Sequence, residues 1–442
     1  MRNFLKKNFL IFLLVGVILV SLTACSKNKS TAANSAGSKQ GKEQTISGTI
    51  TVFGWGGGEE LKVRKEATQI FRKLYPNVKV KEIWLPANEV DKKLDAALAA
   101  GNAADVIMMS PDWYGLRTKW FEDLTPYVKK DHLDLQNIYT PGVDVGYVDS
   151  DGKREGLPVT ASAFVFAYNK DIFDKAGVPY PTDNWTWDDF KTICERVSSG
   201  SGINRIYGIV SHWVLPNFAT IAYGGKMYND GWTKQMVDDP NSLKGLQMFG
   251  DLFAKKAIPD NAASNTMPMD QMFASGKAAI YPMGLFEAAQ IATEIGNHFK
   301  WDVVLPPKDP EGKNTNISFL TGFAMNKDSK NKAAAWEYIK TVSTNKEIAD
   351  LYCKVDIPSL RESAESTFKT MRIGNSQITT EKFVKGLETA TMNPWGGALA
   401  KAGDQYTQMW QQITIKHRSA IDAAKEYAPR IQSALDELHS QK

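Results

Sequence analysis

Aromatic and polar residues that follow expected strands are the residues of this sequence that could do chemistry. Trp55 and Gly56 stand after one β-branched run, Asp112 and Trp113 after a second apolar run, and Ser162 within a third. Ligands of open α/β sheets lie outside the carboxyl ends of the strands. A tryptophan ring offers a large flat apolar surface, and a carboxylate can accept hydrogen bonds from two hydroxyl groups. These positions are therefore candidates for binding a hydroxyl-rich ligand.

The second half of the chain supplies further candidates of the same kinds. They are Trp213, Tyr223, Gly284, Phe286, Glu287 and Trp395. Structural interpretations compete with a ligand role, because Asp112 could cap a helix and because Trp213 and Phe286 could belong to an apolar core. Trp55 stands among the glycines of 54–58, where no apolar helix face exists, so a ligand role is favoured there.

No catalytic or cofactor motif accompanies these residues. The five histidines form no HExxH or other metal-binding spacing, and no G-x-S-x-G sequence is present. Glu59 occupies the third glycine position of a dinucleotide fingerprint, and neither Gly-Lys pair continues as a P-loop. We therefore expect no cofactor, no metal, and binding rather than turnover. A glycosidase can draw its two carboxylates from anywhere in a fold, so an enzyme remains an alternative.

The composition is that of an ordinary soluble protein with more than one core. The 442 residues are 43% hydrophobic and 23% charged, and a chain of this length predicts two lobes. The formal net charge of +4 falls to +1 without the three basic residues of the N-terminal segment, and no basic patch indicates nucleic acid. Cys194 and Cys353 lie in helical, apolar contexts that favour buried thiols, although an exported protein could join them in a disulfide.

The N-terminus has the features of a targeting segment. A basic start precedes Phe9–Val20, an apolar run that is too short to span a bilayer as a helix. Leu22–Cys25 resembles a lipoprotein signal, which implies lipidation of Cys25 and cleavage before it. The alternative is an ordinary signal peptide cut near Ala24. Ser26–Glu43 has no aromatic or branched aliphatic residue and is expected to form a flexible tether.

The order of apolar patterns predicts an α/β fold. Runs at 49–53, 78–83 and 105–109 predict strands, and helical periodicity lies between them. This β-α-β-α-β order is typical of a parallel sheet with helices on both faces. The apolar face of the first helix is expected to comprise Val63, Ala67, Ile70, Phe71 and Leu74. Further strands are expected at 157–159, 207–210, 278–280, 301–305 and 322–325.

One stretch carries a resemblance to a known family. Gly156–Phe190 reads GLPVTASAFVFAYNKDIFDKAGVPYPTDNWTWDDF, with a capping box of Thr186 and Asp189 near its end. Together with ADVIMMS at 104–110 and FASGKAA at 273–279, it resembles the extracellular solute-binding proteins of bacterial ABC sugar importers, of the maltose-binding and multiple-sugar-binding kind. The resemblance covers about 45–435 of the chain.

The resemblance implies a two-lobed periplasmic-binding-protein fold of type II-like α/β architecture. Each lobe is expected to be a mostly parallel sheet flanked by helices, with three hinge crossings near 158–162, 305–308 and 355–359. The expected domains are a signal peptide at 1–24, a lipidated cysteine and tether at 25–44, lobe 1 at 45–160 plus 307–357, and lobe 2 at 161–306 plus 358–442.

The family also implies a function. It implies a lipid-anchored monomer on the extracytoplasmic face of the cell membrane that captures a carbohydrate, in particular an oligosaccharide, by hinge closure and delivers it to an ABC transporter permease. Asp112 matches the family's hydroxyl-binding carboxylate. Phe286 stands where the family often has a stacking tryptophan, which leaves the extent of the stacking surface open. The alternatives are a secreted carbohydrate-active enzyme and a binder of a non-sugar solute such as a polyamine.

Overall fold

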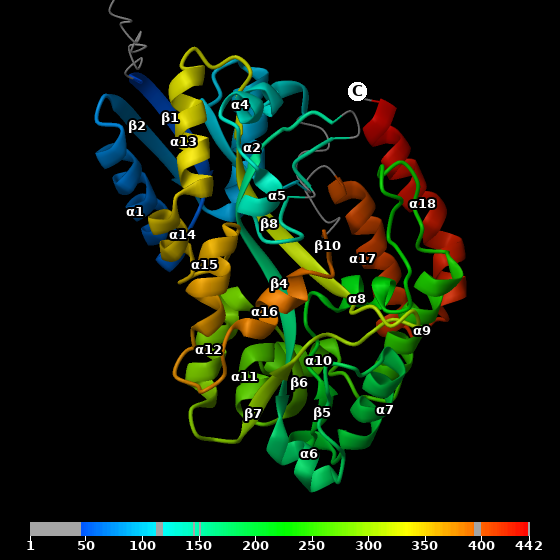
Figure 1. The fold of residues 1–442 in the computed structure, drawn as a ribbon. Coiled ribbons are helices and arrows are strands. Elements are labelled where there is room, and N and C mark those ends of the chain that lie inside the picture. Colours follow the sequence, from blue (N-terminus) through cyan, green and yellow to red (C-terminus); the bar gives the residue numbers. More distant parts are fainter. Residues whose placement is uncertain (1–45, 112–117, 145, 150–151, 393–398, 441–442) are drawn as a thin grey trace, which may run out of the picture. The chain divides into compact units, whose positions relative to one another are not determined.

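A computed structural model describes residues 46–111, 118–144, 146–149, 152–392 and 399–440 (Figure 1). The predicted signal peptide, Cys25 and the tether lie outside these residues. Three candidate ligand residues, Asp112, Trp113 and Trp395, also lie outside them.

The described residues form a ten-stranded sheet in which β2-β1-β3-β8-β4-β6-β5 are neighbours in that order. β10 pairs with β8, while β7 and β9 pair with β4. The strands are β1 (Gly48–Trp55), β2 (Val78–Leu85), β3 (Val106–Met109), β4 (Leu157–Asn169), β5 (Tyr207–Ile209), β6 (Ala278–Gly284), β7 (Trp301–Val304), β8 (Asn316–Met325), β9 (Ile357–Pro358) and β10 (Ala390–Met392).

The predicted β-α-β-α-β opening is confirmed, but the sheet is mixed rather than mostly parallel. β1 pairs in parallel with β2 and β3, and β5 pairs in parallel with β6. Around the middle the pairing is antiparallel, because β4 runs against β6, β7, β8 and β9, and β8 also runs against β3. The long strands β4 and β8 lie side by side in Figure 1 and join the two parallel ends of the sheet.

Helices connect these strands and cover the sheet. The first and second helices, α1 (Gly58–Leu74) and α2 (Ala87–Ala99), occupy the predicted positions. The others are α4 (Thr125–Lys130), α5 (Leu135–Ile138), α6 (Lys170–Ala176), α7 (Trp187–Val197), α8 (Leu215–Ile221), α9 (Pro240–Ala254), α10 (Asn261–Thr266), α11 (Met269–Ala274), α12 (Leu285–Ile295), α13 (Lys332–Thr344), α14 (Lys346–Tyr352), α15 (Arg361–Ser366), α16 (Glu381–Leu387), α17 (Ala400–Thr414) and α18 (Ala420–Ser440).

Local sequence signals account for several helix boundaries. The predicted capping box at the start of α7 is present, since Thr186 and Asp189 each accept a hydrogen bond from the other's backbone amide. α6 ends at Gly177, whose φ of 63° is the left-handed conformation that glycine adopts without strain. One prediction for α1 is wrong: Leu74 is 53% exposed, because its position falls at the helix end, beyond the buried stripe that ends at Phe71.

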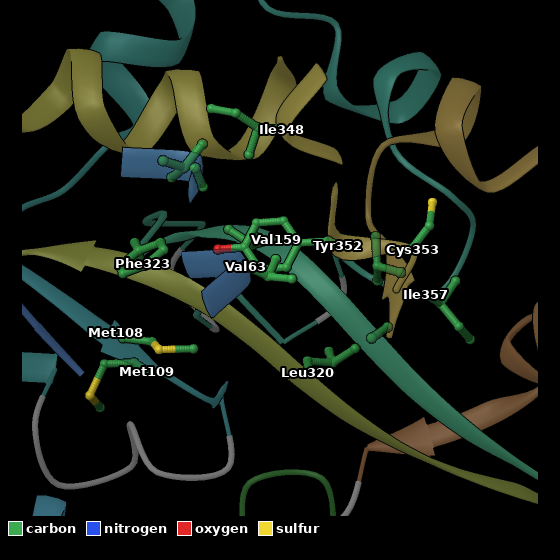
Figure 2. Packing of buried hydrophobic residues seen from close by; sticks show 14 of the residues in the cluster. Val63, Met108, Met109, Val159, Leu320, Phe323, Ile348, Tyr352, Cys353 and Ile357 are labelled. Atoms are coloured by element: carbon green, nitrogen blue, oxygen red, sulfur yellow. The ribbon is translucent and has the colours of Figure 1, made fainter. Parts of the chain in front are cut away.

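Buried apolar residues form two clusters that meet along β4. Every residue of β4 is buried, as is typical of a strand rich in small and apolar residues that is covered on both faces. Figure 2 shows part of the first cluster, in which Val159 of β4 and Leu320 of β8 lie near Ile357 of β9. Cys353 belongs to this cluster and Cys194 to the other. Both thiols are buried and free, so the interpretation as buried free thiols is confirmed.

The chain joins the two parts of the sheet mainly through β4 and β8. The segment 305–308 packs near the start of α7, where the Lys308 amide donates to the Trp185 carbonyl and the Leu305 carbonyl accepts from Trp185 Nε1. The strand that follows it, β8, pairs with β4 at Ser318 and with β3 at Met325. The lobe boundaries and the three hinge crossings remain predictions.

Candidate functional site

Every second side chain of β4 lies on the same face of the sheet. Along the strand, these side chains change from polar residues at one end to an aromatic residue at the other. Residues directly opposite each other in antiparallel strands place their side chains on the same face. Ser162 lies opposite Phe319 of β8, and Phe164 lies opposite Gly284 of β6. Thr160, two residues before Ser162, extends the same face toward β9. We call this row of side chains, with its cross-strand neighbours, the β4 face.

The aromatic end of the β4 face exposes two large rings. Phe164 is buried and contacts the rings of Trp213, Phe286 and Phe319 at centroid distances of 6.0, 6.3 and 6.1 Å. Trp213 and Phe286 lie 6.4 Å apart with an angle of 33° between their planes, and they are 49% and 53% exposed. Two neighbouring, mutually tilted rings that are half-exposed to solvent form an aromatic surface suited to the apolar face of a ligand.

A partly buried hydrogen-bond network lies beside these rings, and its His212 ring contacts the Trp213 ring at a centroid distance of 5.2 Å. Glu287 accepts hydrogen bonds from the Gly284 amide and the Tyr281 hydroxyl, each at 2.9 Å, and its Oε1 lies 3.3 Å from His212 Nε2. The Val214 amide donates to His212 Nδ1, so the neutral ring carries its proton on Nε2 and donates it to Glu287. Burial, together with the Glu287 carboxylate, raises the pKa of Tyr281. Both oxygens of Glu287 are thus engaged by hydrogen bonds within the protein.

The polar end of the β4 face meets β9 and α1. Ser162 is only 4% exposed, and its side chain lies next to the Asp356 carboxyl. Asp356 directly precedes β9, whose Ile357 pairs with Ala161 of β4. Glu60 and Arg64 of α1 lie within electrostatic reach of the Asp356 carboxyl. Arg64 is buried and forms a 2.9 Å ion pair with Glu60, whose side chain is 45% exposed.

Trp55 and Gly56 adjoin this polar end through Arg64. The Arg64 guanidinium carbon lies 6.0 Å from the centroid of the partly buried Trp55 ring, a cation–π arrangement. A Cβ at position 56 would stand 2.8 Å from Arg64 Nη1. Gly56 therefore lets the guanidinium lie close to the end of β1.

The structure does not bring Tyr223 into this arrangement. Tyr223 is 5% exposed and belongs to the second buried cluster. Its hydroxyl donates to Asp188 at 2.6 Å, and Lys244 lies 3.9 Å above its ring. These contacts indicate that Tyr223 has a structural role, as a residue that packs within the fold.

Sequence patterns identified part of this site and missed the rest. Trp213, Gly284, Phe286 and Glu287 come together, and Ser162 lies on the same face. The residues that the sequence analysis did not single out are Glu60, Arg64, Phe164, Phe319 and Asp356. The alternation within β4 could have indicated Phe164, whereas the others depend on pairing between distant segments.

Two further properties concern only the part of the chain that the structure describes. Within it, no group of three or more His, Cys, Asp or Glu side chains could hold a metal ion. No helix of that part is long and apolar enough to cross a membrane.

Comparisons with known proteins agree with this fold. The chain is 24% identical to the galactooligosaccharide-binding protein of Bacillus subtilis over 81% of its length and 82% of that protein. It is also 24% identical to the maltotriose-binding protein of Pyrococcus abyssi, over 65% of this chain and 61% of that protein.

Solved structures show the same two-lobed periplasmic-binding-protein fold. An ABC substrate-binding protein of Listeria monocytogenes, in complex with cycloalternan, matches 88% of this chain and 99% of its own with a TM-score of 0.73 and 23% identity. The sugar-binding protein MalE of Xanthomonas citri matches 89% of this chain and 98% of its own, with a TM-score of 0.75 and 20% identity. A family model described as bacterial extracellular solute-binding protein matches residues 57–349. The chain therefore belongs to the family of bacterial extracellular solute-binding proteins.

Proposed function

We propose that this protein binds a carbohydrate, in particular an oligosaccharide, and delivers it to the permease of an ABC transporter. The observation that carries the proposal is the exposed aromatic surface of Trp213 and Phe286. Sugar rings present apolar C–H faces that stack on such surfaces, and their hydroxyl groups need polar partners of the kind that the other end of the β4 face supplies. Relatives named for maltotriose and galactooligosaccharide binding support a sugar as the ligand.

The proposal includes the remaining features inferred from the sequence. The protein acts as a lipid-anchored monomer outside the cytoplasm, held by Cys25 and the tether, and it closes about a hinge when sugar binds. Asp112, Trp113 and Trp395 complete the site from segments that lie outside the described residues. Ligand contacts with both lobes favour the closed state by the difference in binding free energy between the two states.

Thermal shift and calorimetry test the carbohydrate assignment. The panel comprises maltotriose, galactotriose and mannotriose, with spermidine as a non-sugar solute. At least one trisaccharide is expected to raise the melting temperature, because a ligand that binds only the folded state stabilises it. A shift with spermidine and with none of the sugars would contradict the proposal.

Variants of the aromatic surface connect that binding to the site. Trp213→Ala and Phe286→Ala are each expected to weaken trisaccharide binding by about 1–3 kcal/mol, because each removes stacking area. Tyr180→Ala is the matched control, since Tyr180 is an exposed aromatic residue whose hydroxyl bonds Asp174 and whose ring contacts lie elsewhere. Unchanged affinity in both Trp213→Ala and Phe286→Ala would reject this surface as the binding site.

The alternative of a carbohydrate-active enzyme makes a different prediction. An enzyme would convert the sugar that it binds into products, whereas a transport protein returns it unchanged. Chromatography of the bound trisaccharide after a long incubation separates the two functions. We expect the intact trisaccharide alone, and release of smaller sugars in proportion to protein concentration would establish the enzyme.

A further inference from the structure

Trp213, which carries one ring of the exposed aromatic surface, lies inside a short hydrogen-bonded turn. The side chain of His212, the residue before it, accepts at Nδ1 the amide of Val214, the residue after it, over 3.2 Å. The His212 carbonyl also accepts the Leu215 amide at 3.0 Å. A side chain that bonds the backbone two residues further on restricts the conformation of the residue between them. The backbone of Trp213 is therefore constrained by the imidazole of its own neighbour.

Phe286, which carries the second ring, is enclosed in a similar way. It lies in the first turn of α12, where Glu287 accepts the Gly284 amide at 2.9 Å. The Phe286 ring packs against Gly284, because a Cβ at that position would stand 2.7 Å from the Cζ atom of the ring. The hydrogen bond across Phe286 and the missing side chain of Gly284 therefore restrict where this ring can lie.

A hydrogen bond joins these two segments of the chain. Glu287 Oε1 lies 3.3 Å from His212 Nε2, and Glu287 Oε2 accepts the Tyr281 hydroxyl at 2.9 Å. The His212 side chain is fully buried, and its ring contacts that of Trp213 at a centroid distance of 5.2 Å. His212 follows β5 and Glu287 follows β6, so this bond ties together the two segments that present the exposed rings.

We propose that His212 and Glu287 are positioning residues, which hold the two exposed rings in the arrangement that binds the ligand. His212 acts on the ring of Trp213, and Glu287 acts on that of Phe286. This inference rests on the proposed carbohydrate function. Glu287, a candidate ligand residue in the sequence, thereby acts through a ring instead of touching the sugar. Rings that are fixed before the ligand arrives lose less side-chain entropy on binding, and this difference appears as affinity.

A double-mutant cycle separates positioning from ligand contact and from general damage to the fold. Calorimetry on the full-length mature protein uses maltotriose, galactotriose and mannotriose as probes. His212→Ala is expected to weaken trisaccharide binding by about three- to thirtyfold, within the range of coupling between contacting residues. In a Trp213→Ala background the same change should cost no more than about twofold, because the ring that His212 contacts is gone.

Conservative variants keep the test decisive if His212→Ala does not fold. His212→Asn can still accept the Val214 amide, but its side chain ends before the position of Nε2, so it should lose less affinity than His212→Ala does. Glu287→Gln offers one acceptor oxygen to three donor groups and should also weaken binding. His439→Ala is the matched control, since it removes a histidine that lies against the Trp232 carbonyl, and it should leave affinity unchanged.

Acrylamide quenching tests the position of the ring without any sugar. The fluorescence of Trp213 is obtained as the difference between each protein and its Trp213→Phe counterpart. His212→Ala should raise the quenching constant of this fluorescence, because a ring released from its turn samples more exposed orientations. Unchanged quenching, unchanged affinity, or an equal fold-loss of affinity with and without Trp213 would overturn this inference and leave the proposed function intact. A wild type that binds none of the trisaccharides would overturn both.

Discussion

Glu155 illustrates how a single buried residue can govern the response to pH. It is 4% exposed, and its Oε1 has no hydrogen-bond partner among the described residues. Burial raises the pKa of Glu155 to about 7, with Lys153 opposing the shift and Asp149 adding to it. The residue precedes β4, so its protonation state bears on the anchoring of the central strand.

The pH dependence of stability should therefore contain a contribution from Glu155. Between its usual pKa of 4.5 and its folded-state value of about 7, the unfolded chain loses the proton while the folded protein keeps it. The free energy of unfolding consequently falls as pH rises through this window and stays lower above it. In urea denaturation at pH 5 and pH 8, Glu155→Gln should lessen that fall by on the order of 1–3 kcal/mol. Parallel curves for the variant and the wild type would exclude this role.

At the scale of elements, close helix packing depends on a few glycines. α8 and α9 pack against each other in the second buried cluster, and a Cβ at Gly245 of α9 would stand 1.9 Å from the Ala219 carbonyl oxygen. That oxygen belongs to the backbone of α8 and cannot move aside as a side chain can. The helices can approach this closely only because position 245 has no side chain.

Gly245→Ala should consequently destabilise the protein, although alanine favours helices. We expect a loss of about 2–4 kcal/mol, because the methyl group forces the helices apart. Gly57→Ala is the matched control, since a Cβ there meets nothing within 4 Å and its φ is −144°. Chemical denaturation should show Gly57→Ala within about 0.5 kcal/mol of the wild type. A Gly245→Ala variant as stable as Gly57→Ala would show that the two helices can separate without cost.

At the scale of the whole molecule, the described fold suggests how ligand binding and shape are coupled. β4 and β8 are continuous strands that run through the middle of the sheet, and β9 pairs beside them. Each end of the β4 face contains residues from the part of the chain predicted to form lobe 1 and from the part predicted to form lobe 2. A ligand that contacts both ends would therefore favour one relative arrangement of the lobes.

Closure of this kind should be visible in solution. Saturation with a trisaccharide that binds is expected to reduce the radius of gyration measured by X-ray scattering, and to change tryptophan emission through Trp213. Ser162→Pro, which stiffens β4 within a predicted hinge crossing, should weaken binding and diminish the change. Scattering curves of free and saturated protein that superimpose within error would support a rigid site instead.

The membrane anchor is a prediction about the precursor as a whole. If Cys25 carries the lipid, metabolic labelling with a radioactive fatty acid should label the wild type, and Cys25→Ser should abolish the label and release the protein from membranes. Cys194→Ser is the control, because that thiol is buried within the fold. Retention of the native protein on membranes without any label would reject the lipoprotein assignment.

The sequence by itself determined the type and approximate position of many elements, and it indicated candidate regions for ligand binding. The capping box of α7 and the β-α-β-α-β opening are local patterns, and each was found where it was predicted. The strand expected at 157–159 is also present, although β4 continues to Asn169. Trp213 and Phe286 each follow a strand, and this position made them candidate ligand residues before their mutual contact was known. Local backbone preferences and hydrophobic periodicity act over a few residues, so they can be read directly from the sequence.

Only the tertiary structure decided which distant residues meet. The pairing of β4 with β9 brings Asp356 next to Ser162, and the β4–β8 register brings Phe319 to Phe164. The same long-range packing buries Tyr223 and makes the central pairings antiparallel. Strand register and helix contact arise from the simultaneous packing of many side chains that are far apart in the chain. No local pattern encodes such contacts, and the polar end of the site consists of them.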